Sequence, residues 1–436
     1  MKTFIRRLSP KPPRQTCILD TCCRPRSAAE AVNDRASRIP TLSGPNRNRR
    51  RRTISTTLSV LSLADFLDAM ASPLGAAEMS AACGTPVVVD LGASGLSVPS
   101  AGQDTAARVT GLPTVIVGVH PAGFDGPPAS VAGLVDLVVA DPEPVVAAVE
   151  ASPQAAVTLA LVLRASLSLP VPAALAAESA AYSTLQSGPE FARWRAARSA
   201  AAGRAAPSGA AGAAGAGGAG GAGGAGGAGG TRGPAGPGVA DAASPTGAGR
   251  PGPGAGRVVV VERDAAGLRV TLSRPERHNA VNMALRDQLV EALLVACADP
   301  TIERVVLDGA GPSFCSGGDL TEFGTLPDPA TAHLVRLTRS PARLLGELAP
   351  RLEVRLHGAC IGAGIEMAAF ARRVVAHPDT AISLPEVGLG LIPGAGGTVS
   401  LPRRIGRHRT AELALSPTPI DAATALRWGL IDAIEP

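Results

Sequence analysis

Residues 199–256 consist mainly of glycine, alanine and proline, first as Gly-Ala-Gly-Gly repeats and then as alternating Pro and Gly. A segment of this composition cannot bury apolar surface or hold a fixed backbone, so it is predicted to be a disordered linker. The chain must therefore fold on either side of this linker. No Gly-Lys-Ser/Thr follows the glycines, so they do not form the phosphate-binding loop that such clusters superficially suggest.

The N-terminal segment carries the positive charge of the chain. Residues 1–52 contain 14 Lys and Arg against 3 Asp and Glu, whereas the remainder contains 27 against 33. Residues 1–55 are predicted to be a disordered basic arm, either a transit peptide, a nucleic-acid tail or an extension without function. No aromatic residues interleave with its arginines, as single-strand binders usually require. The extension without function is therefore preferred, and no nucleic-acid partner is expected.

Cysteine usage and hydropathy indicate the compartment. The seven cysteines form no C-x-x-C pair and have no histidine at metal-ligand spacing, which predicts a reducing cytoplasm and no metal site. No segment reaches eighteen uninterrupted apolar residues, and the first residues lack the apolar stretch of a secretory signal. We therefore expect a cytoplasmic protein without a membrane partner.

Residues 56–198 are predicted to form a smaller α/β domain. Short apolar, β-branched runs at 86–91, 112–118 and 135–141 are bounded by Gly, Pro and Asp, as buried parallel strands are. Helical spacing follows through residue 198, including a polar amphipathic helix at 172–185. This region shows α/β organisation without obvious chemistry.

Residues 257–436 alternate strand and helix patterns. A hairpin is predicted at 258–272, a helix at Met283–Ala298 with apolar residues on one face, and a helix at 331–348. Asp299-Pro300 ends the first of these helices. The alternation predicts an α/β unit built from repeated β-β-α turns with right-handed crossovers.

Two glutamates in this unit each lie in a turn marked by glycine or proline. Glu366 ends the segment HGACIGAGIE, and Glu386 lies in LPEVGLGLIPGAGG, twenty residues later. Two carboxyl groups that share a pocket can supply both an acid and a base. A glutamate in the first turn of a helix can also simply be favoured by the helix dipole, but the paired spacing favours catalysis.

Two backbone amides are candidates for an oxyanion hole. Gly318 follows a second glycine in the loop SFCSGGDL, and Ala363 lies at the start of a predicted helix, where its N–H has no partner within the helix. Two such donors can stabilise the negative charge that develops on a thioester oxygen. Cys315, beside this loop, has no histidine placed as a base and is predicted to be a packing residue.

Five segments together resemble the enoyl-CoA hydratase/isomerase (crotonase) superfamily across residues 257–436. They are LSRPERHNA at 272–280, FCSGGD at 314–319, HGACIGAGIEMA at 357–368, LPEVGLGLIPGAGG at 384–397 and AATALRWGLID at 422–432. One such glycine motif is weak evidence, whereas their order and spacing together are specific. The resemblance implies a crotonase-like fold, a repeated β-β-α superhelix, preceded here by the smaller α/β domain and the linker.

The resemblance also implies roles for individual residues. Glu366 and Glu386 would be the catalytic pair of a hydro-lyase, an enoyl-CoA hydratase that adds water across the C2=C3 bond of a 2-enoyl-CoA. Gly318 and Ala363 would form the oxyanion hole, and Gly394 would help to hold the catalytic water. No cofactor is expected, because coenzyme A is part of the substrate, and the family tendency predicts a homo-oligomer, a trimer or hexamer. The implied CoA-binding residues are Arg277, His278, Asn279, Ala280 and Asp319.

Two other functions remain open from the sequence. The same pocket could catalyse double-bond isomerisation or another crotonase-type reaction, since isomerisation in many relatives needs one carboxylate. The chain could also be a non-catalytic acyl-CoA-binding protein. Residues 135–198 carry a strand-then-helices pattern like the end of a crotonase unit, so residues 80–198 are hypothesised to be a degenerate, inactive crotonase-like half whose helices cover the catalytic half.

Overall fold

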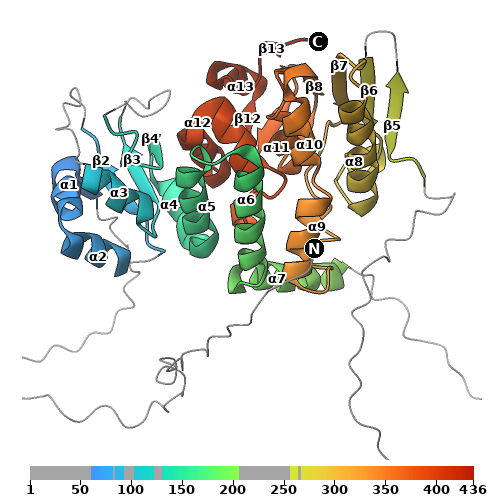
Figure 1. Cartoon of the computed structure of the whole chain (residues 1–436). Coiled ribbons are helices and arrows are strands. Elements are labelled where there is room, and N and C mark those ends of the chain that lie inside the picture. Colours follow the sequence, from blue (N-terminus) through green and yellow to red (C-terminus); the bar gives the residue numbers. More distant parts are fainter. Residues whose placement is uncertain (1–59, 82–83, 93–102, 122–129, 206–255, 264–266) are drawn as a thin grey trace, which may run out of the picture. The chain divides into compact units, whose positions relative to one another are not determined.

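The computed structural model describes residues 60–81, 84–92, 103–121, 130–205, 256–263 and 267–436 (Figure 1). The predicted basic arm at 1–55 and almost all of the predicted linker lie outside these residues. The described elements all belong to one unit, Leu58–Pro436.

The first part of this unit is a parallel sheet with the strand order β1-β2-β3-β4. β2 and β4 lie within predicted apolar runs, β3 extends one residue past its predicted run, and β1 was not predicted. Phe66 and Met70 of α1 are fully buried against it, as their i, i+4 spacing requires. The elements are β1 (Val60–Ser62), α1 (Leu63–Ala71), α2 (Pro73–Ala81), β2 (Val87–Asp90), α3 (Gln103–Gly111), β3 (Ile116–Val119) and β4 (Leu137–Val139).

Four helices follow β4: α4 (Glu143–Ala151), α5 (Pro153–Ser166), α6 (Val171–Gln186) and α7 (Pro189–Ala205). Among the described residues, no single helix has the length and hydropathy needed to cross a membrane, although α4 and α5, bent by 109° between them, pass that test as a pair.

The main sheet has six strands in the order β13-β10-β8-β7-β6-β5. β5 and β6 form the predicted antiparallel hairpin, and the other neighbours are parallel. Leu268, Val270 and Leu272 alternate into the core of this sheet. The strands are β5 (Val259–Arg263), β6 (Gly267–Leu272), β7 (Arg304–Gly309), β8 (Leu352–Leu356), β10 (Arg373–Ala376) and β13 (Ala433–Ile434).

A second sheet of three strands has the order β12-β11-β9. Strands of the two sheets succeed each other along the chain, so β8, β9 and α11 form one strand-strand-helix unit, and β10, β11 and α12 form the next. The repeat over a complete superhelix stays a prediction. The remaining elements here are β9 (Ala359–Ile361), α11 (Ala363–Ala368), β11 (Ala381–Ser383), η3 (Glu386–Leu389), α12 (Gly397–Leu415), β12 (Ile420–Asp421) and α13 (Ala422–Trp428).

Three α-helices lie between β6 and β8 in the chain: α8 (Met283–Ala298), α9 (Pro329–Thr338) and α10 (Pro341–Leu348). Helix α8 packs on β5 and β6, α10 packs on α8, and α9 packs on α6. The bounds of α8 coincide with the predicted helix, and Asn282 caps its N-terminus by accepting a hydrogen bond from the amide of Leu285. The single predicted helix at 331–348 is wrong, because the chain breaks into α9 and α10. Ser340 caps α10, and Pro341 occupies its first turn, where its missing N–H costs nothing.

Helices α5 and α6 are hydrogen-bonded to the later part of the chain. Ser166 Oγ at the end of α5 donates to the carbonyl of Thr398 at 2.5 Å, and Ser183 Oγ of α6 donates to the carbonyl of Pro329 at 2.9 Å. Helix α5 therefore packs on α12, and helix α6 packs on α9 and α12, which follow much later in the chain.

Candidate active site

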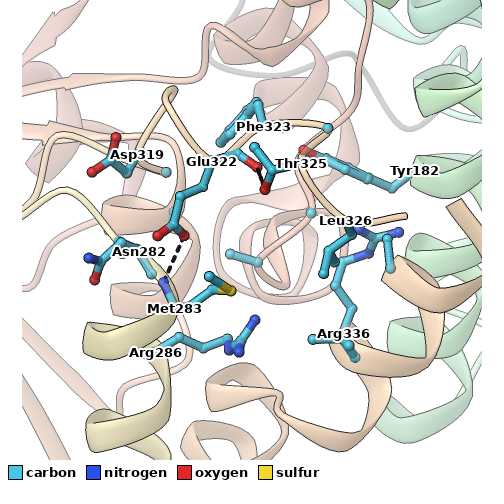
Figure 2. Close-up of a pocket in the computed structure, with 18 of the residues that line it drawn as sticks. Tyr182, Asn282, Met283, Arg286, Asp319, Glu322, Phe323, Thr325, Leu326 and Arg336 are labelled. Carbon is cyan, nitrogen blue, oxygen red and sulfur yellow. Dashed lines mark hydrogen bonds between the residues drawn. The ribbon is translucent and has the colours of Figure 1, made fainter. Parts of the chain in front are cut away.

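A cavity of about 220 Å³ is bordered by helix α6 and by residues between 281 and 395 (Figure 2). The five residues predicted to carry the chemistry all line it: Gly318, Ala363, Glu366, Glu386 and Gly394. Asp319, predicted to contact CoA, lines it as well. Side chains from α6, α8 and α9 complete the wall.

Glu366 lies in the first turn of α11 and is 2% exposed. Its Oε2 accepts hydrogen bonds from the amides of Ala395 at 2.7 Å and Gly397 at 2.9 Å. Only a glycine fits at position 397, because an added Cβ would lie 2.6 Å from Glu366 Cγ. The glycine-rich turn at 394–397 therefore holds this carboxyl group through its backbone.

Glu386 begins the short helix η3 and is 9% exposed. Its Oε2 is buried and has no hydrogen-bond partner among the described residues, so this oxygen is free to meet a ligand. Its Oε1 lies 2.3 Å from the point where a Cβ on Gly362 would stand. Gly362 also has φ = 50°, a backbone conformation that favours glycine.

The two carboxyl groups influence each other's protonation. Burial, followed by the negative charges of Glu386 and Glu178, raises the pKa of Glu366 well above its usual value, although two backbone hydrogen bonds oppose this. Burial also raises the pKa of Glu386 to about 7. Like charges in one buried site disfavour double ionisation, so the pair favours retaining a proton near neutral pH.

The amides of Gly318 and Ala363 are available to a ligand. Neither donates a hydrogen bond to another residue in the part of the chain that the structure describes. The two loops that carry them run together, because the amide of Ile361 donates to the carbonyl of Cys315 at 2.9 Å. The Ala363 nitrogen would lie 3.9 Å from a Cβ added to Gly317. The two loops therefore lie next to each other at the edge of the cavity.

Helix α6 contributes two residues that the sequence analysis did not place in the site. Glu178, 2% exposed, accepts hydrogen bonds from the amide of Gly396 at 2.8 Å and from the amide and hydroxyl of Thr398 at 2.9 and 2.7 Å. Consecutive amides at the start of α12 thus bind Glu366 and Glu178 in alternation. Burial raises the pKa of Glu178 to about 7, against these hydrogen bonds.

Tyr182, one helical turn after Glu178, lines the cavity and packs on the glycine-rich turn (Figure 2). A Cβ on Gly394 would lie 2.5 Å from the tyrosine ring, so only glycine fits there. Arg336 of α9 lies over the ring, with its guanidinium carbon 4.5 Å from the ring centroid. The sequence shows polar side chains at helical spacing along α6, but this spacing does not reveal which residues they contact in the folded chain.

The other residues predicted to bind CoA lie apart from this cavity. Arg277, His278, Asn279 and Ala280 are not among its described lining residues, and their contact with CoA stays a prediction. The Asn279 side chain is fully buried, and its amide nitrogen donates to backbone carbonyls, including that of Ser313 at 2.8 Å. The structure therefore gives the Asn279 side chain a role in holding the loop.

Among the described residues, no three His, Cys, Asp or Glu side chains are placed to hold a metal ion. Burial raises the pKa of the Cys315 thiol to about 12, and this residue is fully buried. A thiol in that state is a poor nucleophile, which agrees with packing as its role.

Gly362→Ala tests how Glu386 is positioned. The added methyl group would displace the Glu386 carboxyl and strain the backbone, so we expect a loss of about 1–3 kcal/mol in the free energy of unfolding and a fall in kcat of about tenfold or more. Gly388→Ala is the matched control, because an added Cβ there has no heavy atom within 4 Å. Equal kinetics of the two variants would contradict the assigned contact.

Comparison with known proteins identifies the later part of the chain. Residues 262–436 match the family model described as enoyl-CoA hydratase/isomerase. The chain is 36% identical over 178 residues to 2,3-dehydroadipyl-CoA hydratase of Escherichia coli, covering 41% of this chain and 69% of the relative. It is 34% identical to mevalonyl-coenzyme A hydratase of Beauveria bassiana, covering 39% and 63%.

Other relatives carry other activities in their names. 1,2-Epoxyphenylacetyl-CoA isomerase of Escherichia coli is 36% identical, with coverage of 38% of this chain and 64% of the relative. The solved structure of enoyl-CoA hydratase from Thermoplasma volcanium is 31% identical and covers 41% of this chain and 71% of that chain, with a TM-score of 0.37. The chain spans 63% to 69% of the three curated relatives described here. It belongs to the enoyl-CoA hydratase/isomerase family, within the crotonase superfamily.

Proposed function

We propose that the chain is an enoyl-CoA hydratase that adds water across the C2=C3 bond of a 2-enoyl-CoA. The observation that carries this proposal is one cavity with two buried carboxyl groups of raised pKa and two amides without a described partner. Two of the relatives above are named as hydratases of acyl-CoA thioesters. No cofactor is required, because the thioester itself is the activating group. A cytoplasmic location and a homo-oligomeric state are part of the proposal.

In the proposed reaction, the amides of Gly318 and Ala363 bind the thioester oxygen. Negative charge accumulates on that oxygen as the enolate forms, and fixed N–H donors in a buried site stabilise the transition state more than the ground state. Polarisation of the carbonyl also makes C3 electrophilic. Water can then add to C3 once a base removes its proton.

The glutamate pair supplies the base and the acid. The charge of Glu386 is one cause of the raised pKa of Glu366, so this cause disappears when Glu386 carries the shared proton. Two backbone N–H groups then stabilise the Glu366 carboxylate, and Glu366 is assigned as the base that takes a proton from water. Glu386 Oε2 has no described donor, which favours its protonated form, and Glu386 is assigned as the acid that protonates C2. Each hydration consumes one water, which supplies the hydroxyl group at C3 and a proton to Glu366, while Glu386 gives its proton to C2. A proton must then return from Glu366 to Glu386 before the next turnover.

The direct test uses crotonyl-CoA and purified full-length protein. Hydration removes the conjugated double bond, so absorbance of the enoyl thioester should fall with time and 3-hydroxybutyryl-CoA should accumulate. If the chromophore persists while 3-enoyl thioesters are converted to 2-enoyl thioesters, the reaction is isomerisation instead, as in the relative named an isomerase of another CoA thioester.

Ala363→Pro tests the oxyanion hole. Proline is tolerated at the first position of a helix and removes only the N–H, so we expect kcat to fall by about 10²–10³-fold. Ala363→Gly retains the amide and should keep kcat within about threefold of the native value. Circular dichroism would verify that both variants are folded, and a proline variant of undiminished kcat would remove Ala363 from the mechanism.

A further inference from the structure

A second cavity, of about 160 Å³, adjoins the first. The two cavities share the lining residues Val281, Arg286, Arg336, Ala363, Gly394 and Ala395. Gly318 and Asp319, on the side where CoA is predicted to enter, line only the first cavity. The second cavity therefore continues the site beyond Ala363 and Gly394, in the direction available to the distal end of an acyl chain.

The charge of this second cavity is strongly asymmetric. Among its described lining residues, the only carboxylate is Glu178, and both of its oxygens already accept hydrogen bonds. Four arginines line the same space: Arg286, Arg336, Arg339 and Arg343. An apolar acyl chain would displace water from Arg336 and Arg339 without supplying an opposite charge, because neither forms an ion pair with a described carboxylate.

The Arg336 guanidinium group is partly buried and forms hydrogen bonds only to neutral groups among the described residues. Its Nε donates to Ser179 Oγ at 3.2 Å, its Nη1 donates to Gln186 Oε1 at 3.2 Å, and its Nη2 donates to Ser183 Oγ. All three acceptors are neutral, and no carboxylate forms an ion pair with Arg336 in the described part of the chain. Burial lowers the pKa of Arg336, and the nearby charge of Glu178 offsets this only in part.

The other three arginines differ in their pairing. Arg286 and Arg343 pair with Asp287 and Glu347 at 2.9 and 2.6 Å, both solvent-accessible neighbours on their own helices. Arg339, by contrast, has no side-chain partner among the described residues. Figure 2 shows Arg286 on α8 and Arg336 on α9 at the first cavity, and both residues also line the second. The Arg339 guanidinium, which has no described partner, can bind a carboxylate through two parallel N–H donors, and the buried charge of Arg336 adds to the attraction.

We propose that the acyl group processed here ends in a carboxylate, so that the substrates are monothioesters of dicarboxylic acids, bound through Arg336 and Arg339. This inference rests on the proposed function, because the position of the thioester at Gly318 and Ala363 sets the direction of the acyl chain. The distal carboxylate then neutralises the cations of the second cavity, and a methyl-terminated chain of equal length does not.

The test compares binding of adipyl-CoA and hexanoyl-CoA to the full-length protein by isothermal titration calorimetry. Both thioesters have six-carbon acyl chains and no double bond, so neither is hydrated. We expect adipyl-CoA to bind at least tenfold more tightly, and the preference to shrink when salt is raised. Arg339→Gln should reduce the preference severalfold, and Arg336→Gln should do so more strongly.

Arg427→Gln is the control, since this exposed arginine on α13 lines neither cavity. Equal dissociation constants of the two thioesters for the native protein would overturn the proposal. Equal weakening of both thioesters in Arg339→Gln would also overturn it, because the arginine would then bind the shared CoA moiety. A protein that fails to hydrate enoyl thioesters but retains the preference for adipyl-CoA would refute the proposed hydration and leave the carboxylate site standing.

Discussion

Glu366→Gln and Glu386→Gln should each lower kcat for hydration of crotonyl-CoA by about 10²–10⁴-fold, the usual contribution of a general acid or base. Glutamine has nearly the same shape as glutamate but neither accepts nor gives up a proton at neutral pH. At position 366 the glutamine carbonyl oxygen can still accept hydrogen bonds from the amides of Ala395 and Gly397, so the 394–397 turn should keep its conformation. Steady-state kinetics with both variants gives the measurement.

Glu435→Gln is the matched control, because Glu435 is solvent-accessible, pairs with Arg373 at 2.7 Å and lines neither cavity. Its kcat should equal that of the native protein. If only one of the two active-site variants loses activity, a one-carboxylate reaction such as isomerisation is favoured. If neither variant changes the turnover of any acyl-CoA, the chain is an acyl-CoA-binding protein without catalysis.

The local parts of the site could be predicted from the sequence because they depend on short glycine-rich segments. Ala363 and Glu366 follow Gly362 within a few residues, and Gly394 lies in its own glycine-rich turn, so each motif carries much of its local geometry. The turn that binds the Glu366 carboxyl group is itself one of these motifs, although it lies 29 positions later. Helix α8 could also be predicted, because its apolar face and the residue that ends it, Asp299, lie within the helix or directly after it. The break at Ser340 was missed because hydropathic periodicity continues across a proline that begins a new helix.

The contribution of α6 could not be predicted in the same way. Its buried face includes the polar residues Glu178, Ser179 and Ser183 beside Tyr182, so hydropathy does not distinguish it from an exposed face. Their partners on α9 and α12 lie about 150 to 220 positions later in the chain. Only the folded chain shows that these polar groups are satisfied there, which is why Glu178 and Arg336 were absent from the predicted site.

Replacing Glu178 should have a large effect on both stability and the pH dependence of catalysis. Glu178→Ala leaves two buried amides and one hydroxyl of the 396–398 segment without an acceptor, each worth about 1–3 kcal/mol, so the free energy of unfolding should fall by about 3 kcal/mol or more. The same segment holds Glu366, and kcat should fall with it. Chemical denaturation and steady-state kinetics measure the two effects.

Glu178→Gln separates the charge from the shape, because glutamine retains one acceptor. The negative charge of Glu178 helps to raise the pKa of both Glu366 and Glu386, so removing it lowers both values. Catalysis is lost when both active-site glutamates ionise, and the alkaline limb of the kcat profile should therefore move to lower pH by about half a unit or more. Asp136→Asn is the control, since this buried carboxylate, paired with Arg164 at 2.6 Å, lines neither cavity. It should destabilise the fold while leaving the alkaline limb in place. An unmoved limb in Glu178→Gln would mean that α6 supports the site through packing alone.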